Sequence, residues 1–271
     1  MSAVRDRVVL VTGASRGLGV AIARRFAVEG ARLAITARTG EEGGHRFPGS
    51  LTTTTEELRS LGATVVPVVA DLGVAADRAR LADEVEAELG PVEVLVNNAA
   101  ITYFEPVARF REDRYRLMFE VQVRAPFELV QRFLPGMVER HQGWILNISS
   151  GSARHPQGPP YAARAAASNM TVYGMCKAAL ERMTTGLAAE VYEHGVAVNV
   201  LSPSGLVATP GVVHHELTKH VPPEALEAPE VLAEAALALC VGDPEVLTGR
   251  VTYAKAILAE LGPPVPGAAA P

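Results

Sequence analysis

The chain has 271 residues, 48% of them hydrophobic and 20% charged, so it can bury a substantial core as one domain of the larger α/β kind. Its net charge of −5 and the lack of a basic tract interleaved with aromatic residues argue against a nucleic-acid partner. Two cysteines are too few for a disulfide scaffold, and neither a leader peptide nor an apolar run of membrane-spanning length is evident, which predicts a cytoplasmic protein without a membrane partner.

The first predicted strand is Val8–Val11, a short apolar run rich in β-branched residues. A glycine-rich turn follows, with the sequence TGASRGLG, and then apolar residues recur at helical spacing up to residue 30. In such a turn Gly13 permits the tight bend, Gly17 lets a phosphate approach the main chain, and Gly19 lets helix and strand pack closely. The free N–H groups of the helix N-terminus would then bind a pyrophosphate, unless the turn is merely structural.

Two other motifs overlap this turn. Residues 13–17 match the Gly-x-Ser-x-Gly nucleophile elbow of hydrolases, with Ser15 as the nucleophile. That elbow requires earlier strands that supply an oxyanion loop, and only about a dozen residues precede Ser15. A Walker phosphate loop is excluded, because Gly17 is followed by Leu18-Gly19 instead of Lys-Ser or Lys-Thr. A hydrolase therefore remains only a distant alternative.

Further apolar runs alternate with helical patterns, which predicts a parallel, doubly wound sheet of about seven strands, a Rossmann fold, in one domain over residues 1–262. The later predicted strands are Ala31–Ala37, Thr64–Ala70, Val92–Val96, Trp144–Ser149, Val196–Leu201 and Arg250–Tyr253. Ligands bind beyond the carboxyl ends of such strands, so the glycine turn, Asp71, Asn98 and Ser150 should share one rim. The Pro/Ala-rich residues 263–271 are expected to form a disordered tail.

The end of the second predicted strand bears on cofactor choice. An enzyme selective for NAD would place an acidic residue here, on the ribose hydroxyls, but the sequence is Thr-Ala-Arg-Thr. Arg38 and Arg16 could instead clamp a 2′-phosphate, which favours NADP, with NAD still possible. Alternatively, Arg38 is an ordinary solvated arginine. Glu41 and Glu42 could weaken the selectivity, although they lie in an insertion that we expect to turn away.

One helical turn separates Tyr173 from Lys177, so both side chains lie on the same helix face. A nearby ammonium favours the phenolate and lowers the pKa of the tyrosine toward the working pH, which would make the pair an acid–base group. By itself this spacing also occurs in solvated pairs. Cys176, inside the same turn, is expected to serve packing rather than redox chemistry.

With these motifs the chain resembles the short-chain dehydrogenase/reductase family from about residue 5 to about residue 260. The resemblance rests on the glycine turn, on Tyr173-x-x-x-Lys177 and on short motifs in the family's order. These are Asp71-Leu72, Asn97-Asn98-Ala99-Ala100, Asn147-Ile148-Ser149-Ser150, and Asn199 with Pro203, Gly205 and Thr209. The resemblance implies an oxidoreductase that transfers a hydride between NADP(H) or NAD(H) and a ketone or secondary alcohol, with a hydrophobic or cyclic substrate.

The resemblance also implies roles for single residues. Tyr173 would exchange a proton with the substrate oxygen, Lys177 would bind the nicotinamide ribose and lower the pKa of Tyr173, and Ser150 would polarise the substrate oxygen. Asp71 would bind the adenine amino group, unless it caps a helix. The expected cofactor-binding residues are Gly13, Ser15, Arg16, Gly17, Leu18, Gly19, Arg38, Asp71, Leu72, Asn98, Ala99, Ala100, Tyr173, Lys177, Pro203, Gly205, Val207 and Thr209.

Two features depart from the family pattern. Gln122 occupies the position of a catalytic asparagine that supports a water between the lysine and solvent, and we expect the longer amide to keep that relay in altered form. The stretch 152–170 is longer than usual and should shape the substrate mouth or a subunit contact. Within it, Tyr161 is not a second catalytic tyrosine, since Ala165 stands where a lysine would be needed. A catalytically silent dinucleotide-binding sensor is the competing hypothesis.

A histidine-rich segment lies at residues 214–220. His215 and His220 are five residues apart rather than the four of the zinc motif, so no metal site is expected. By its position the segment is the family's substrate-binding loop, in which Val212, Val213, His214 and Leu217 could cover an apolar substrate. The predicted helices Pro126–His141 and Thr171–Glu193 pair across subunits in this family, which implies a homodimer or homotetramer rather than a slightly sticky monomer.

Overall fold

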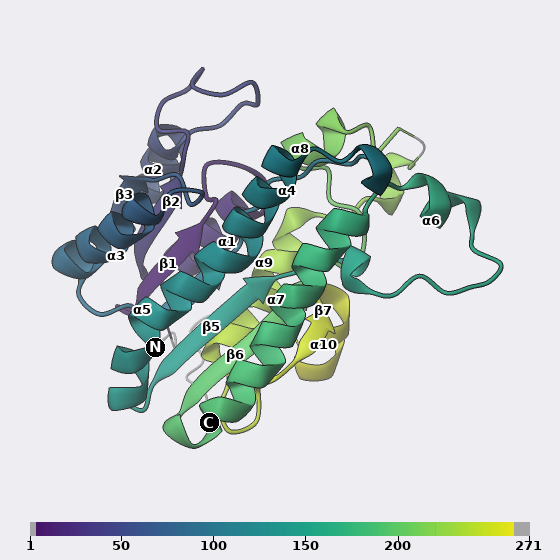
Figure 1. Ribbon diagram of the computed structural model, residues 1–271. Helices are drawn as coiled ribbons and strands as arrows, with labels where there is room; N and C mark the ends of the chain where they lie inside the picture. Colours follow the sequence, from purple (N-terminus) through teal and green to yellow (C-terminus); the bar gives the residue numbers. More distant parts are fainter. Residues whose placement is uncertain (1–3, 220, 263–271) are drawn as a thin grey trace.

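A seven-stranded parallel sheet with helices on both faces forms the body of the protein (Figure 1). The computed structural model describes residues 4–219 and 221–262; the predicted tail 263–271 lies outside the described residues. The strands are β1 (Val8–Thr12), β2 (Arg32–Ala37), β3 (Val65–Val69), β4 (Val94–Asn97), β5 (Gly143–Ile148), β6 (Val196–Ser202) and β7 (Val251–Tyr253). Their order in the sheet is β3-β2-β1-β4-β5-β6-β7. This is the predicted doubly wound fold, and each predicted strand is present with small changes at its ends.

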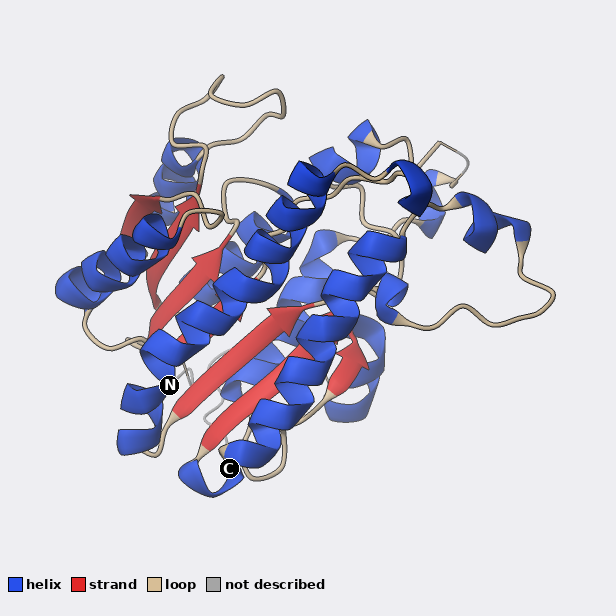
Figure 2. Ribbon diagram, viewed as in Figure 1, coloured by secondary structure: helices blue, strands red, loops and turns tan. Residues whose placement is uncertain are grey.

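Helices connect the strands and cover both faces of the sheet (Figure 2). The α-helices are α1 (Gly17–Val28), α2 (Leu51–Ser60), α3 (Ala75–Leu89), α4 (Glu112–Phe119), α5 (Ala125–Glu139), α6 (Ala163–Ala167), α7 (Thr171–Glu190), α8 (Pro210–His214), α9 (Pro229–Val241) and α10 (Ala254–Leu261). A π-helical turn, Glu120–Arg124, joins α4 to α5. Short 3₁₀ turns lie at Val107–Arg109, Gly151–Ala153, Tyr192–His194 and Pro223–Ala225. Among the described helices, none is both long and apolar enough to cross a membrane.

Burial explains why β1 reads as an unbroken apolar run. Alternate side chains of a strand point to opposite faces, and here both faces are covered. Val9 and Val11 belong to the core formed with α1, α2, α9 and α10, whereas Val8 and Leu10 belong to the core formed with α3, α5 and α7. The sheet is therefore buried from both sides and holds the carboxyl ends of its strands in a fixed arrangement.

The topology places the strand ends that carry the candidate motifs next to one another. The chain runs outward through β1, β2 and β3 and then returns to set β4 beside β1, so the strand order reverses between β1 and β4. Ligands of doubly wound sheets bind in the crevice at such a reversal. The loops after β1, β4 and β5 are direct neighbours there, and the loops after β2 and β6 flank them.

The long stretch between Ser150 and Tyr173 projects from the body of the protein, with α6 near its tip (Figure 1). Tyr161 in this stretch is 60% exposed. The residues nearest α7, among them Arg154 and His155, line a second, shallow groove together with Arg182. Most of the stretch between Ser150 and Tyr173 thus turns away from the strand ends.

Candidate active site

A cavity of about 680 Å³ opens at the carboxyl ends of the strands. The expected site residues that line it are Gly13, Ser15, Arg16, Gly17, Leu18, Arg38, Asp71, Leu72, Asn98, Ala99, Ala100, Ser150, Tyr173, Lys177, Pro203, Gly205, Val207 and Thr209. Two expected residues, Gly19 and Gln122, are not part of this lining. The rim predicted from the strand ends therefore exists, and it brings nearly all of the expected residues together.

The glycine turn after β1 has a backbone that only glycine suits. Gly13 and Gly17 have φ values of +69° and +60°, in the left-handed region. At Gly19 a Cβ atom would lie 2.3 Å from the carbonyl oxygen of Gly13, so Gly19 acts by close packing behind the cavity. Gly13 and Gly17 also let neighbouring loops approach, since a Cβ there would lie 2.8 Å from Ala99 Cα and 3.2 Å from the Thr209 methyl group, respectively. Both glycines line the cavity at the start of α1, where a dinucleotide phosphate can bind.

Asn98, directly after β4, holds this turn in place. Its Nδ2 donates hydrogen bonds to the carbonyl oxygens of Thr12, at 2.8 Å, and Gly13, at 3.2 Å. The hydroxyl of Thr12 in turn accepts from the backbone N–H groups of Asn98 and Ala99. These reciprocal bonds tie the end of β1 to the end of β4, and the backbone of residues 98–100 lines the cavity beside them.

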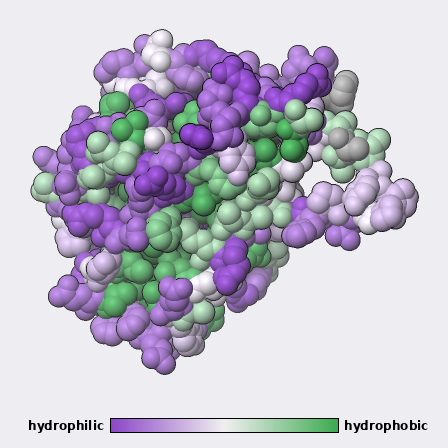
Figure 3. All heavy atoms as spheres, in the orientation of Figure 1, coloured by the Kyte–Doolittle hydropathy of each residue, from purple (hydrophilic) through white to green (hydrophobic). Residues whose placement is uncertain are grey.

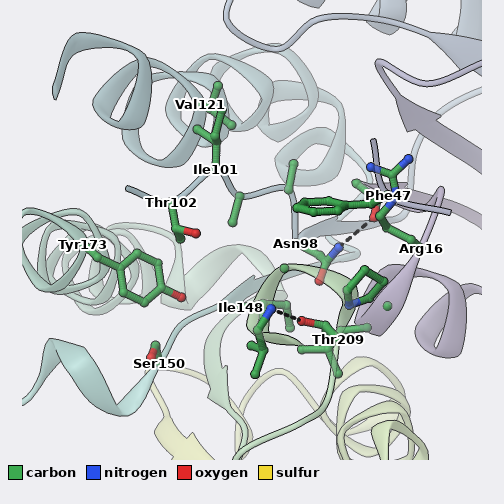
Figure 4. Close-up of a pocket in the computed structure, with 18 of the residues that line it drawn as sticks. Arg16, Phe47, Asn98, Ile101, Thr102, Val121, Ile148, Ser150, Tyr173 and Thr209 are labelled. Carbon is green, nitrogen blue, oxygen red and sulfur yellow. Dashed lines mark hydrogen bonds between the residues drawn. The ribbon is translucent and has the colours of Figure 1, made fainter. Parts of the chain in front are cut away.

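The candidate proton-transfer residues come from β5 and α7. Ser150 follows β5 and Tyr173 lies in the first turn of α7, and Figure 4 shows their side chains on the same side of the cavity. Lys177, one turn further along α7, is 3% exposed, and its Nζ donates a 2.8 Å hydrogen bond to the carbonyl oxygen of Ile148. The phenol, the serine hydroxyl and the ammonium thus converge, as the spacing of Tyr173 and Lys177 predicted.

The pKa of Tyr173 departs from the expectation. Burial among apolar neighbours raises it to about 12, and a hydrogen bond with the Ser150 hydroxyl acts in the opposite direction. Lys177 was expected to lower this pKa, but it is not among the causes of the shift. Its ammonium lies 5.7 Å from the centre of the Tyr173 ring. The expected lowering is therefore wrong for this arrangement, because burial of the phenol determines the direction of the shift.

Burial also acts on Lys177 and lowers the pKa of its ammonium to about 8, while the charge of Glu181 acts in the opposite direction. Glu181 lies one turn after Lys177 on α7. Its carboxylate accepts a 2.7 Å hydrogen bond from the hydroxyl of Ser149. Glu181 thereby links the end of β5 to the helix that carries Tyr173 and Lys177.

A buried run of side-chain hydrogen bonds fixes α7 to the sheet. Asn97 Nδ2 donates to Asn147 Oδ1 at 2.9 Å, and Asn147 Nδ2 donates to the hydroxyl of Thr184 at 2.8 Å. The Thr184 hydroxyl donates to the carbonyl oxygen of Leu180 within α7. All three polar side chains are buried, so each bond avoids the cost of an unpaired polar group.

Gln122 lies in the π-helical turn and is 1% exposed. Its Nε2 donates a 2.9 Å hydrogen bond to the carbonyl oxygen of Ile101, a residue that lines the cavity. Its Oε1 is buried and has no hydrogen-bond partner within the described residues. Such single π-turns inside α-helices often mark functional positions. The amide therefore presents one unused acceptor behind the wall of the cavity.

The adenosine end of the cavity differs from the expectation for Arg16. Its Nη2 donates to the carbonyl oxygen of Gly49 at 2.7 Å and to the hydroxyl of Thr39, and its Nε donates to the carbonyl oxygen of Pro48. Its Nη1 contacts His45 Nδ1 at 3.1 Å. The guanidinium thus holds the loop over residues 40–50, and the expected clamp formed jointly with Arg38 is not present in this arrangement.

The expectation that the insertion with Glu41 and Glu42 turns away is wrong, because His45, Arg46 and Phe47 of this insertion line the cavity. Only its two acidic residues point elsewhere. Glu42 accepts from the backbone N–H of Gly49 and Glu41 accepts from the hydroxyl of Thr52, and neither lines the cavity. Arg38 lies 3.9 Å from Asp71 in a half-exposed ion pair of little strength. Asp71 also accepts from the N–H of Gly73 at 2.8 Å and so shapes the loop that leads into α3.

Several residues that line the cavity were not predicted individually, although Met170 belongs to the stretch 152–170 that was expected at the substrate mouth. His45, Arg46 and Phe47 come from the insertion after β2, and Thr102, Tyr103, Phe104, Met170 and His215 surround the end that carries Tyr173. In the histidine-rich segment, Val212 and Leu217 line the cavity as expected, but Val213 is 52% exposed and His214 contacts Phe47 instead. No strand or helix period marks these loop positions, so the pattern carried no signal for them.

Comparisons with known proteins agree with this geometry. Residues 7–219 match the family model for short chain dehydrogenases. The chain belongs to the short chain dehydrogenase family of oxidoreductases. This dehydrogenase is 33% identical over 205 residues to a short chain dehydrogenase of Pseudocercospora fijiensis, which covers 75% of this chain and 60% of the relative's length. It is 30% identical over 212 residues to the ketoacyl reductase HetN of a Nostoc species, covering 78% of this chain and 67% of HetN.

Among solved structures, this dehydrogenase is similar to L-sorbose reductase from Gluconobacter frateurii, crystallised with NADPH and L-sorbose. The TM-score is 0.78, the sequences are 27% identical, and the match covers 93% of this chain and 97% of the reductase. In the described part of this dehydrogenase, histidine, cysteine, aspartate and glutamate side chains form no group of three or more that could hold a metal ion. His220 lies outside the described residues.

Proposed function

We propose that this dehydrogenase reduces a ketone to a secondary alcohol with NADPH as the preferred cofactor. The observation that carries the proposal is the convergence of Tyr173 and Ser150 on the cavity that the glycine turn also lines. A bound nicotinamide supplies the hydride, and the protein must then protonate the substrate oxygen and stabilise its developing charge. The similarity to ketoacyl and L-sorbose reductases supports carbonyl chemistry.

The side chains of α7 and β5 divide this work. The Tyr173 hydroxyl donates its proton to the substrate oxygen, and the Ser150 hydroxyl donates a hydrogen bond to the same oxygen. The Lys177 ammonium binds the ribose hydroxyls of the nicotinamide half and supplies positive charge beside the phenolate that Tyr173 becomes. Burial keeps the Tyr173 hydroxyl protonated at neutral pH, so it holds the proton that ketone reduction requires.

Gln122 supports the water that restores the proton to the active site. Its unpaired Oε1 can accept a hydrogen bond from a water, while its Nε2 remains bound to Ile101. A water held there would connect the buried Lys177 with solvent, in place of the shorter asparagine of related enzymes. The buried acceptor supports this role, because an amide oxygen without a partner is costly.

The preference for NADPH rests on the basic residues at the adenosine end. Burial lowers the pKa of His45, and the positive charges of three nearby arginines, Arg16, Arg38 and Arg46, lower it further. Arg16 is occupied by the loop, so Arg38, which also lines the cavity, is the residue that would bind a 2′-phosphate. The bound NADPH of the sorbose reductase supports this assignment.

The substrate end is mainly apolar. Ile101, Phe104, Met170, Val212 and Leu217 line it. Polar contacts besides Tyr173 and Ser150 come from Thr102, whose hydroxyl lies 3.4 Å from His215 Nε2. We therefore assign a hydrophobic or cyclic ketone, since apolar side chains favour an apolar body and the two hydroxyls can bind its oxygen.

A homodimer or homotetramer is the proposed assembly. Figure 3 shows hydrophobic residues, in green, gathered over and between α5 and α7. Phe127 on α5 and Met175 on α7 are each more than two-fifths exposed. An apolar face of this kind supports burial against a second copy of the chain. Mass measured by light scattering or native mass spectrometry tests it, and a monomer at micromolar concentration would contradict it.

One experiment tests the proposed reaction. The purified protein is offered a panel of cyclic and aromatic ketones with NADPH and, separately, with NADH, and the loss of reduced-nicotinamide absorbance is followed. We expect turnover of at least one apolar ketone, with a higher kcat/KM for NADPH. Binding of NADPH without turnover of any ketone or secondary alcohol would instead favour the dinucleotide sensor.

A further inference from the structure

Two loops that follow distant strands meet above the cavity. The insertion over residues 40–50 follows β2, and the segment with α8 follows β6, while β1, β4 and β5 lie between these two strands. Neighbouring strands are about 4.8 Å apart, so the two loops bridge roughly 19 Å of strand ends. The glycine turn, residues 98–100 and Ser150 all follow the intervening strands. Any contact between the two loops therefore passes over the cofactor-binding rim.

Aromatic rings make this contact. The ring centroids of Phe47 and His214 are 5.1 Å apart. The pair belongs to a series of rings that runs from the insertion to the candidate proton donor. The successive centroid distances are 4.9 Å for His45–Phe47, 5.1 Å for Phe47–His214, 5.2 Å for His214–His215, 4.7 Å for His215–Phe104 and 5.9 Å for Phe104–Tyr173. Figure 4 shows Phe47 and Tyr173 at opposite ends of the cavity.

The insertion is fixed to the glycine turn and is not a loose loop. Gly49 has a φ of +99°, and a Cβ at this position would lie 2.4 Å from the carbonyl oxygen of Ser15. Arg16 also donates hydrogen bonds to the carbonyl oxygens of Pro48 and Gly49. His45 Nδ1 faces two donors, the guanidinium of Arg16 and the backbone N–H of Phe47, so it must be unprotonated and accept from both. Phe47 is thus presented to the cavity by a braced loop.

The segment with α8 is braced on the other side of the turn. The hydroxyl of Thr209 caps α8 by accepting from the N–H of Val212. The Thr209 methyl group packs against Gly17, since a Cβ there would approach it to 3.2 Å. Both loops therefore rest on the glycine turn, one on each side, and their rings meet above it.

We propose that Phe47 is a cofactor-retaining residue, and that its contact with His214 must open before the dinucleotide can leave the cavity. Phe47 and the glycine turn line the same cavity, so the Phe47 ring can contact a dinucleotide that is bound against this turn. The proposal rests on the proposed function only in that a dinucleotide binds here. It adds that release of the dinucleotide, and not only its affinity, depends on two residues outside the family's motifs.

The test measures release of NADPH directly. Protein loaded with NADPH is mixed with excess NADP⁺ in a stopped-flow instrument, and the fall of the fluorescence of bound NADPH gives the release rate. An aromatic contact of this kind is worth enough to expect a release rate about five- to tenfold faster in Phe47→Ala. Phe47→Tyr keeps the ring and should release NADPH at close to the wild-type rate.

Two further variants separate the contact from a general disturbance. Phe47→Ala combined with His214→Ala should release NADPH no faster than Phe47→Ala alone, because both remove the same contact. Tyr161→Ala removes an exposed ring that does not line the cavity, and its release rate should be unchanged. The proposal would be overturned if the double variant released NADPH several-fold faster than Phe47→Ala. It would also be overturned if Phe47→Ala released NADPH at the wild-type rate. If the wild-type protein binds neither NADPH nor NADH, the proposed function fails as well.

Discussion

The two ends of the cavity are built in different ways. At the end that carries Tyr173, the side chains come from β5 and α7, and buried hydrogen bonds among Asn97, Asn147 and Thr184 hold these elements together. At the adenosine end, Arg38 directly follows β2, and further side chains come from the insertion over residues 40–50, which hydrogen bonds from Arg16 hold in place. The first end is part of the core, whereas the second lies on the surface.

This difference indicates where each property of the enzyme resides. Proton transfer needs atoms held within a fraction of an ångström, and packed elements provide that. Binding and release of a cofactor require a part that can open, and surface loops have the lower local stability that opening needs. Variants at the Tyr173 end should therefore act on the chemical step, and variants at the adenosine end should act on cofactor binding.

The largest effect is expected for Tyr173→Phe. Loss of the proton donor should lower turnover by about a thousandfold, since general acid catalysis contributes that much. Affinity for NADPH should change little, because the phenol is not needed to bind the dinucleotide. Ketone reduction and NADPH binding by fluorescence titration are measured in parallel. Tyr161→Phe serves as the matched control, and an active Tyr173→Phe enzyme would refute the assignment.

At the other end, Arg38→Gln should lower kcat/KM for NADPH by roughly 10- to 100-fold, which is the cost of a lost charge-assisted pair with a phosphate. The value for NADH should stay within about threefold of the wild type, because NADH has no 2′-phosphate. Steady-state kinetics with both cofactors measures the change. Arg109→Gln, at an exposed position away from the cavity, is the control. Equal losses with both cofactors would contradict phosphate recognition by Arg38.

A smaller effect is expected from pH at the Tyr173 end. The ammonium of Lys177 has a pKa lowered to about 8, so it is charged below this pH and loses its proton above it. The kcat/KM for ketone reduction should therefore fall as the pH rises through about 8. Glu181 raises the pKa of Lys177, so Glu181→Gln should begin this fall at a lower pH. At pH 8.5 the variant should be about threefold less active than the wild type.

The control for this profile is Glu190→Gln, an exposed carboxylate near the end of the same helix. It removes an equal charge at a distance from Lys177 and should leave the profile unchanged. A merely structural role of Glu181 would lower activity equally at every pH. Identical profiles for wild type and Glu181→Gln would show that the carboxylate does not act on Lys177.

The smallest effect is expected for Gln122→Asn. The shorter amide keeps one donor and one acceptor, so activity should stay within about threefold of the wild type. Gln122→Leu removes both groups and should lower turnover by about tenfold, because the acceptor for the relaying water is lost. Turnover is compared at saturating ketone and NADPH. An inactive Asn variant beside an active Leu variant would exclude the relay.

The fold and the pairing of Tyr173 with Lys177 could be predicted from the sequence because they follow from periodicity and from short-range spacing. The apolar run at Val8–Val11 marks a strand covered on both faces, and the spacing of Tyr173 and Lys177 marks one helix face. The pKa of Tyr173 could not be predicted, because it depends on burial by residues distant in the chain, such as Met118.

The adenosine end was predicted only in part, for a similar reason. Arg38 lines the cavity, as the end of β2 suggested. The role of Arg16 was missed, because its partners Pro48 and Gly49 lie about thirty residues away in a loop without regular structure. Phe47 gave no signal at all: a single aromatic residue in a loop rich in glycine and charge has no period to identify its partner.

The hydrogen-bonded run from Asn97 through Asn147 to Thr184 determines how far α7 can slide. A shift of one residue would move Thr184 by about 1.5 Å along the helix axis, enough to break its 2.8 Å bond with Asn147 and leave an amide unpaired in the interior. The register of the helix is thus set about three turns away from Tyr173. Substitutions on the exposed face of α7 are therefore expected to leave the separation of the Tyr173 and Ser150 hydroxyls unchanged.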